Sequence, residues 1–306
     1  MQKYSIFNLI KNAFSNHQKW DLAWKDPTPK KEYDVVIIGG GGHGLATAYY
    51  LAKEHNITNV AIIEKGWIGG GNVGRNTTII RSNYMHDDNA LFSEFGMDLW
   101  RKMSQDLNYN VMFSPRGIIN LAHSDAQMNV YARRGNSMRL NGIDAELLNR
   151  EQVREIIPMA DFSENVRFPI FGGLMQPSAG TARHDAVAWG YARQADSMGV
   201  DIIQNCEVIG FDISGGKVDG VRTSRGDIKV KKIGLCVAGS TNILADKLNM
   251  TLPIETHLLQ ACVSEPVKPV LDKVVTFGAG HFYISQSDKG EMVMGGDLDG
   301  YNSYAQ

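Results

Sequence analysis

Three glycines and one glutamate have the spacing of a dinucleotide-binding site. Gly39, Gly41 and Gly44 fill the glycine positions of G-x-G-x-x-G, and Glu64 lies further along the chain. In this motif the first glycine permits a tight turn, the second lets backbone approach a pyrophosphate, and the third lets helix and strand pack closely. The acid can accept hydrogen bonds from a ribose hydroxyl. The pattern predicts phosphates held by the N–H groups of a helix N-terminus.

The segments around these residues have the composition needed to position them. Residues 35–38 form a continuous apolar run, typical of a parallel strand buried on both faces. Residues 45–51 have the length and alanine content of a helix, and residues 60–63 form a second apolar run that ends at Glu64. A glycine-rich loop without a ligand is the alternative, but strand, glycines, helix, strand and acid in this order favour a dinucleotide site.

A second glycine-rich loop follows Glu64. Residues 66–74 contain five glycines, which indicates close approach of backbone to a ligand. Such a loop fits better beneath a flavin than in a nicotinamide enzyme, where the acid usually leads directly into a helix. Arg81 ends the apolar pair Ile79 and Ile80, so its guanidinium is expected in a largely buried site that supplies an anion. That anion is either a substrate carboxylate or a structural Asp or Glu, and spacing alone favours the structural salt bridge.

The next part of the chain interrupts the dinucleotide pattern. Apolar residues recur at helical intervals over residues 91–107 and 125–140, with a strand-like run at 117–122 between them. These segments predict the start of a second domain. A loop then leads into a predicted helix, and His184 lies at or just before its first turn. The helix dipole and the neighbouring Arg183 favour a neutral, nucleophilic imidazole, although a local hydrogen bond is the commoner role for such a histidine.

A β-meander is predicted next. Its strands are residues 200–208, 218–222 and 228–230, joined by glycine-containing turns. Residues 233–237 are expected to form a separate, buried parallel strand. That strand leads into Ala238, Gly239 and a helix, a second place where glycine meets the carboxyl end of a strand, as at ligand sites in open α/β sheets.

Composition sets the remaining bounds. The chain has 306 residues, 43% hydrophobic and 21% charged, and its net charge of -2 argues against nucleic-acid binding. Three cysteines without a C-x-x-C pair suit a reducing compartment and argue against a disulfide framework or a metal site. No apolar run approaches the length of a membrane span, and residues 1–31 lack a signal sequence, so we expect a cytoplasmic protein. Those first residues are either a poorly ordered tail or an arm that lays its aromatic side chains on the chain's own body or on a partner.

Several segments together resemble a known family. They are GGGGHGLATAYYLAK, EKGWIGGGNVGRNTTIIRSNY, MQPSAGTARHDAVAW, VDIIQNCEV, LCVAGS and HLLQACVSEPVKP. They are similar to the glycine oxidase, sarcosine oxidase and D-amino-acid oxidase group of flavin enzymes, and most similar to the β subunits of heterotetrameric sarcosine oxidases. The resemblance extends from about residue 30 to Gln306.

The resemblance implies an α/β fold, with a Rossmann-like FAD-binding domain and an inserted α+β substrate domain. On that basis residues 1–31 are an N-terminal arm. Residues 32–100 and 165–250 form a discontinuous FAD-binding domain, and residues 101–164 and 251–306 form the substrate domain. The family's chain continues past the position of Gln306 to a third glycine-rich flavin contact and a lysine beside the arginine. We therefore expect this sequence to be a fragment of a longer product.

The resemblance also assigns residues to roles. Non-covalent FAD is expected at Gly39, Gly41, Gly42, Gly44, Glu64, Lys65, Gly71, Arg75, Asn76, Thr77, Val208, Ala238 and Gly239. The family's substrate-carboxylate arginine corresponds to Arg81, and the histidine that carries covalent FMN corresponds to His184. Both assignments favour a functional role over the structural one that spacing alone suggests. Tyr283 and His281, in the strand-like segment HFYIS, are further candidates to face the substrate.

The implied reaction is oxidation of the N-methyl group of sarcosine. Electrons pass through FAD and FMN to oxygen, which gives hydrogen peroxide, and the imine yields glycine with formaldehyde or methylene-tetrahydrofolate. The expected partners are α, γ and δ subunits, with NAD and tetrahydrofolate bound on a partner subunit.

Three alternatives remain open at this stage. The first is a single-flavin dehydrogenase acting on another N-alkyl or cyclic amino acid. Dehydrogenases with covalent FAD usually have their linking histidine in the loop after the acid, and residues 69–81 contain none. The others are a nicotinamide-dependent dehydrogenase and a non-catalytic flavoprotein subunit.

Overall fold

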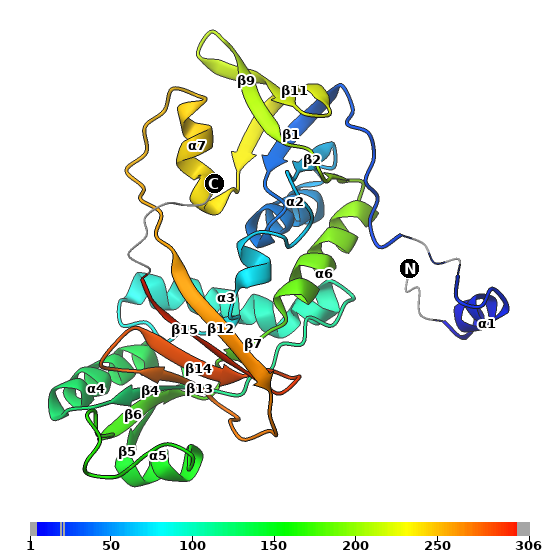
Figure 1. Ribbon diagram of the computed structural model, residues 1–306. Helices are drawn as coiled ribbons and strands as arrows, with labels where there is room; N and C mark the ends of the chain where they lie inside the picture. The colour runs from blue at the N-terminus through cyan, green and yellow to red at the C-terminus, as the bar shows by residue number, and fades with distance from the viewer. Residues whose placement is uncertain (1–4, 19, 21, 299–306) are drawn as a thin grey trace. The chain divides into compact units, whose positions relative to one another are not determined.

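The chain folds into two compact units, each built around its own sheet (Figure 1). The computed structural model describes residues 5–18, 20 and 22–298. Unit 1 comprises Met1–Gly74, Gln105–Asn110 and Asp185–Ile254, and unit 2 comprises Arg75–Ser104, Val111–His184 and Glu255–Gln306. Most of unit 2 is therefore inserted in the chain between two parts of unit 1.

Unit 1 contains a six-stranded sheet in the order β8-β2-β1-β11-β10-β9. The first four strands are parallel, and β10 and β9 extend the sheet in antiparallel fashion. The strands are β1 (Glu32–Ile38), β2 (Val60–Ile63), β8 (Asp201–Ile203), β9 (Val208–Ser214), β10 (Lys217–Thr223) and β11 (Gly226–Leu235). The α-helices are α1 (Ile6–Phe14), α2 (Gly42–His55), α6 (His184–Ser197) and α7 (Thr241–Asp246), with short 3-10 turns η1 (Asn72–Arg75) and η2 (Ala238–Ser240).

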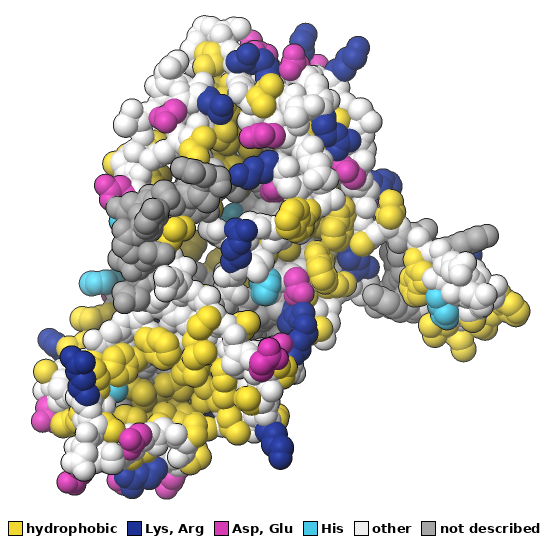
Figure 2. All heavy atoms as spheres, viewed as in Figure 1, with side chains coloured by type: hydrophobic (Ala, Val, Ile, Leu, Met, Phe, Trp, Pro, Cys, Tyr) yellow, Lys and Arg dark blue, Asp and Glu magenta, His cyan; other side chains and the backbone are white. Residues whose placement is uncertain are grey.

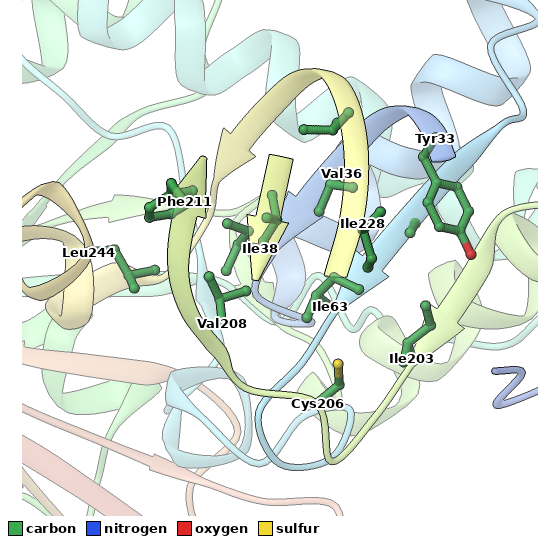
Figure 3. Close-up of a cluster of buried hydrophobic side chains, with 13 residues drawn as sticks. Tyr33, Val36, Ile38, Ile63, Ile203, Cys206, Val208, Phe211, Ile228 and Leu244 are labelled. Carbon is green, nitrogen blue, oxygen red and sulfur yellow. The ribbon is translucent and has the colours of Figure 1, made fainter. Parts of the chain in front are cut away.

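The predicted strand, helix and strand around the glycine motif are present. Residues 35–38 lie in β1, residues 45–51 lie in α2, and β2 covers residues 60–63. One face of this sheet is closed by a cluster that includes Val36, Ile63 and Phe211, with Leu244 from α7 (Figure 3). Because residues 35–38 of β1 and the whole of β2 are apolar, these strands lie inside the sheet rather than at its edges. The carboxyl ends of the parallel strands therefore meet at one edge.

Two strand predictions in this unit were wrong. Residues 200–208 are not one strand: β8 covers only residues 201–203 and β9 begins at Val208, because the chain turns between them at Asn205, which has a left-handed φ of 49°. Residues 233–237 are not a separate strand. Residues 233–235 are the end of β11, which pairs with β10 over residues 226–229 and with β1 over residues 229–235, and residues 236–237 follow the strand.

Unit 2 contains a seven-stranded mixed sheet in the order β12-β15-β14-β13-β4-β6-β5. Its strands are β4 (Ile118–Ala122), β5 (Glu146–Asn149), β6 (Gly172–Gln176), β12 (Leu259–Pro266), β13 (Val274–Phe277), β14 (Phe282–Gln286) and β15 (Glu291–Leu298). A separate pair consists of β3 (Ile79–Ile80) and β7 (Gly180–Thr181). The helices are α3 (Asp87–Asp106), α4 (Asp125–Leu140) and α5 (Arg150–Ile156).

The seven-stranded sheet has different packing on its two faces. Ile119 and Leu121 of β4 belong to a core cluster with Val153 of α5. Leu174 of β6 packs with Met138 of α4 in another cluster. Since side chains alternate along a strand, Asn120 projects to the face opposite that of its neighbours Ile119 and Leu121.

The N-terminal arm forms a helix and is tied to unit 1 near its other end. Ser5 caps α1 by accepting a hydrogen bond from the Asn8 N–H at 3.2 Å. None of the α1 side chains is buried, and apolar side chains gather on its surface (Figure 2). Further along, Asp26 forms an ion pair with Arg225 at 2.8 Å. Within the described part of the arm, Phe7, Phe14 and Trp20 are exposed and Trp24 is half-buried, so these aromatic side chains do not enter the core.

Candidate active site

Gly39 and Gly44 are glycines for reasons internal to the protein. Gly39 follows β1 with a φ of +107°, and a Cβ there would lie 2.3 Å from the carbonyl oxygen of Cys236 at the end of β11. A Cβ on Gly44 would lie 2.0 Å from the carbonyl oxygen of Gly39. No side chain fits either position without moving backbone. These two glycines therefore bring β1, β11 and α2 close together.

Gly41 and Gly42, by contrast, are not required by packing. A Cβ at either position would meet only the Val73 side chain, at 3.8 and 3.5 Å, which are ordinary van der Waals distances. Gly41 is the N-cap of α2 and has no side chain to accept hydrogen bonds from the first turn. The helix N-terminus thus combines bare backbone with the positive end of the helix dipole, an arrangement that fits a pyrophosphate.

Glu64 is held at the end of β2 by two backbone donors. The Gly40 N–H donates to Oε2 and the Gly66 N–H donates to Oε1, each at 2.8 Å. Each carboxylate oxygen keeps a further lone pair, so the carboxylate can still accept a ribose hydroxyl. Gly40 was missing from the predicted site. A Cβ there would lie 2.8 Å from the Ile68 side chain and 3.0 Å from that of Glu64.

The second glycine-rich loop folds compactly against the end of β8. The Ile68 N–H donates to the Gln204 side chain at 2.9 Å, and the Asn205 N–H donates to the Gly66 carbonyl at 2.8 Å. Gly71 is exposed, and a Cβ on it would have no heavy atom within 4 Å. Lys65 is also exposed. The loop therefore leaves free space at Gly71, as close approach of a ligand would require.

The end of β11 meets the glycine motif at the same sheet edge. Gly39 adjoins Cys236, and Ala238 and Gly239 follow in η2. Ala238 has a left-handed φ of 47°, unusual for a residue with a side chain. Burial raises the pKa of the Cys236 thiol. Val208 begins β9, and its side chain belongs to the core cluster, so only its backbone is available to a ligand.

Arg81 follows β3 in unit 2. Its Nη1 donates to Oδ1 of Asn83 at 2.6 Å, and its guanidinium lies 4.6 Å from the centre of the Tyr84 ring. In the described part of the chain, no Asp or Glu forms an ion pair with Arg81. The residue lies at a hollow whose other walls are Ile79, Ile80 and apolar side chains of α3. A cation beside an apolar hollow suits a small carboxylate with an apolar body.

A row of polar side chains crosses the sheet of unit 2. Asn120 of β4 pairs with Thr276 of β13, which pairs with Tyr283 of β14, so the three side chains lie on one face. A Cβ on Gly295 would lie 2.2 Å from the Tyr283 hydroxyl, so this glycine makes room for the phenol. His281 lies just before β14 and is exposed. Tyr283 is thus the better placed of the two predicted candidates.

The remaining predicted site residues also lie in unit 2. Arg75 and Asn76 are exposed and Thr77 is half-buried, and Asn76 Oδ1 accepts a hydrogen bond from the Thr78 N–H at 2.5 Å. His184 is half-buried and is the first residue of α6, as predicted. The Arg183 guanidinium next to it donates to Asp288 at 3.3 Å, so the positive charge beside His184 is partly neutralised.

Comparison with known proteins decides the family. Residues 34–305 match the family described as FAD dependent oxidoreductase (DAO). The chain is 61% identical to the sarcosine oxidase subunit beta of Rhizobium meliloti over 304 residues, which cover 99% of this chain and 73% of the relative. The chain belongs to the FAD-dependent oxidoreductase family and, within it, to the sarcosine oxidase β subunits. The corresponding subunit of Rhodobacter capsulatus is 52% identical and covers 100% of this chain and 74% of the relative.

Solved structures confirm the predicted fold. L-proline dehydrogenase from P. horikoshii superposes with a TM-score of 0.83 and 26% identity, over 90% of this chain and 73% of that one. Glycine oxidase from Geobacillus kaustophilus has a TM-score of 0.77 at 19% identity, over 88% and 72%. The α/β architecture with an FAD-binding part and an inserted substrate part is therefore correct, and the chain is an FAD-dependent oxidoreductase. It spans about three quarters of the length of its curated relatives.

Two further observations concern the described residues. Among them, no helix is long and apolar enough to cross a membrane. Within the same ranges, no group of three His, Cys, Asp or Glu side chains is arranged to hold a metal ion.

Proposed function

We propose that the protein oxidises the N-methyl group of sarcosine as the β subunit of a hetero-oligomer with α, γ and δ subunits. The observation that carries the choice of substrate is Arg81, which meets an apolar hollow without an ion-pair partner among the described residues. The relatives of this protein are named as subunits of sarcosine oxidase, which supports both the proposed substrate and the proposed assembly.

Unit 1 is the proposed FAD-binding unit. Gly41, Gly42 and the N-terminus of α2 would hold the pyrophosphate, and Glu64 would accept a ribose hydroxyl. Gly71, Ala238 and Gly239 would offer backbone to the flavin. When bound, FAD supplies the acceptor for the hydride that leaves the N-methyl carbon, and hydrolysis of the resulting imine gives glycine and formaldehyde.

Unit 2 is the proposed substrate unit. Arg81 would bind the substrate carboxylate, while the Tyr84 ring supports one face of its guanidinium. This contact fixes the end of the substrate that does not react and so orients the N-methyl group. Arg75, Asn76 and Thr77 are proposed flavin contacts, and His184 is the proposed attachment site of covalent FMN, which supplies electron transfer to oxygen. NAD and tetrahydrofolate are proposed ligands of a partner subunit.

The experiment is oxidation of three substrates by the full-length chain co-expressed with its partner subunits. Hydrogen peroxide that forms with sarcosine, and far more slowly with L-proline or N-ethylglycine, supports the proposal. The similarity to an L-proline dehydrogenase favours one rival, a single-flavin dehydrogenase of a cyclic amino acid. Proline-dependent reduction of a dye without peroxide would establish that rival. Bound flavin without any turnover would indicate a non-catalytic subunit.

The FMN assignment has its own test. Peptide mass mapping of the denatured holoenzyme is expected to show an FMN mass on the peptide that contains His184, and its loss in His184→Ala. Release of all flavin as free FAD would remove the His184 assignment and leave the sarcosine assay unaffected.

A further inference from the structure

A chain of side-chain hydrogen bonds runs from Arg81 into the sheet of unit 2. Arg81 Nη1 donates to Oδ1 of Asn83 at 2.6 Å, and Asn83 Nδ2 donates to Oδ1 of Asn120 at 2.7 Å. Asn120 Nδ2 in turn donates to Oγ1 of Thr276 at 2.5 Å. The members come from the segment after β3, from β4 and from β13, so the chain joins parts of unit 2 that are far apart in sequence.

This series of hydrogen bonds can have only one donor-to-acceptor direction. A guanidinium donates hydrogen bonds and accepts none, so Asn83 must turn its amide oxygen toward Arg81. Its amide nitrogen then faces Asn120, which must present its own oxygen and turn its nitrogen toward Thr276. Rotation of either amide by half a turn would set donors against donors. Asn83 is fully buried, so no solvent is available to compensate such a rotation.

A second arginine fixes the backbone of Asn83. Arg134 on α4 donates from Nε to the Asn83 carbonyl at 2.6 Å, and its Nη2 donates to the same oxygen. Burial lowers the pKa of Arg134, and the positive charge of Arg81 lowers it further. In the described ranges, neither arginine forms an ion pair with a carboxylate. Two neighbouring guanidinium groups without a counter-charge favour an anion nearby, and Arg81 is the one of the two that lines the hollow.

Arg81 is therefore held on two sides. Asn83 holds one edge of the guanidinium through Nη1, and the Tyr84 ring lies against a face. Among the described residues, Asn83 is the only side chain to which Arg81 donates. The opposite edge, with Nε and Nη2, keeps the paired donors that bind a carboxylate in bidentate fashion.

We propose that Asn83 is the positioning residue for Arg81, and that Asn120 and Thr276 lock Asn83 in the orientation this task requires. The inference rests on the proposed role of Arg81 in binding the substrate carboxylate. Asn83 does not touch the substrate. It acts by keeping the guanidinium edge pointed at the place where the carboxylate binds.

The test is binding of methoxyacetate, which keeps the carboxylate of sarcosine but has no oxidisable amine. Its dissociation constant is measured from the change in flavin absorbance of the holoenzyme, alongside that of the neutral methoxyacetamide. Asn83→Ala should weaken methoxyacetate binding about tenfold, the value of one hydrogen bond to a charged group. Binding of methoxyacetamide should stay unchanged, because the amide does not need the oriented charge.

Ser82→Ala is the matched control. Ser82 is fully buried and bonded to Glu94 and Gln176, but not to Arg81. The Ser82→Ala variant should have lower thermal stability, while its affinity for methoxyacetate should stay within about twofold of the wild-type value. Thr276→Val is a milder change, at the end of the hydrogen-bond series furthest from Arg81. It should weaken methoxyacetate binding two- to threefold, and it replaces Asn83→Ala in the test if that variant does not fold.

A double-mutant cycle separates positioning from general damage. In an Arg81→Ala background, Asn83→Ala should have no further effect on methoxyacetate binding. An equal weakening of both ligands, or an effect that persists without Arg81, would overturn the proposal. Failure of the wild-type holoenzyme to oxidise sarcosine would refute the proposed function but leave this cycle readable. Failure of the wild-type holoenzyme to bind methoxyacetate while it oxidises sarcosine would overturn the positioning proposal and leave the proposed function standing.

Discussion

A Cβ placed on Gly44 would lie 2.0 Å from the carbonyl oxygen of Gly39, so α2 and the end of β1 approach as closely as backbone allows. Gly44→Ala must push the helix away from the strand. We expect it to destabilise the protein by about 2 kcal/mol, as overpacking of a core typically does. It should also weaken FAD binding at least tenfold, because the helix N-terminus moves.

Gly96→Ala is the control for that substitution. Gly96 lies in α3, and a Cβ there would have no heavy atom within 4 Å. Alanine in a helix is more stable than glycine by up to about 1 kcal/mol, so the thermal midpoint should hold or rise. Titration of the apoprotein with FAD checks both variants. Unchanged FAD affinity in Gly44→Ala would contradict the close packing of helix and strand.

Glu64→Gln tests the anchoring of the acid. The carboxylate accepts one backbone N–H at each oxygen, from Gly40 and Gly66. An amide has a single oxygen, so one N–H loses its acceptor, at a cost of about 1–3 kcal/mol. We expect at least a tenfold loss of FAD affinity by equilibrium dialysis. Glu54→Gln, a substitution at an exposed position of the same unit, is the control and should leave the FAD affinity unchanged. Equal FAD affinities in the two variants would rule out a role of the Glu64 carboxylate in FAD binding.

The strand and helix around the glycine motif could be predicted because local composition determines them. An apolar run, a glycine turn and an alanine-rich helix are each readable over a few residues. The polar chain at Arg81 could not be predicted in this way. Asn83 is separated by 37 residues from Asn120, and Asn120 by 156 from Thr276, so no local pattern joins them. The register of β4 and β13 places Asn120 beside Thr276, and the fold of the segment after β3 brings Asn83 to Asn120.

The positions in the motif already distinguish structural glycines from the ligand-facing one, and the structure agrees: backbone excludes a side chain at Gly39 and Gly44 but not at Gly41. The break between β8 and β9 was missed. Asn205 supplies a left-handed turn within residues 200–208, and a single residue of this type is a weak signal among the surrounding strand formers.

Tyr33 should contribute to the loss of protein stability at high pH. Its hydroxyl donates to Asp201 at 2.8 Å and accepts the Lys30 N–H at 3.0 Å, and burial raises its pKa well above the ordinary value of 10.0. The neutral phenol therefore stabilises the fold fully below pH 10, and this contribution is lost as the pH rises further. Urea unfolding should show a shallower alkaline decline for Tyr33→Phe than for wild type.

The same variant should lose about 1 kcal/mol of unfolding free energy at pH 7, because Asp201 loses one donor. If the unfolding free energies of the two proteins fall in parallel between pH 9 and pH 11, Tyr33 does not cause the loss of stability at alkaline pH.

The three cysteines should react in order of their exposure and ionisation. Cys262 is exposed, Cys236 is half-buried, and Cys206 is buried. The thiolate is the reactive form, and burial raises the pKa of the Cys236 thiol. Iodoacetamide at pH 8 should therefore label Cys262 first and Cys236 at least tenfold more slowly. Because of that raised pKa, the labelling rate at Cys236 should keep rising as the pH is increased above 8.

Mass mapping of the labelled peptides gives the order directly. Labelling of Cys206 should require denaturant. Bound FAD should slow Cys236 further if the flavin covers the end of β11, and faster labelling of Cys236 than of Cys262 would contradict the described burial.

The most direct test of the central claim is kcat/KM for sarcosine in the wild-type holoenzyme and in Arg81→Ala, at equal FAD content. If Arg81 holds the substrate carboxylate, kcat/KM should fall at least about 100-fold, since a charge-assisted bidentate pair contributes about 3 kcal/mol. Binding of neutral methoxyacetamide should not change. A kcat/KM within threefold of wild type would show that sarcosine is held elsewhere and that Arg81 has a structural role.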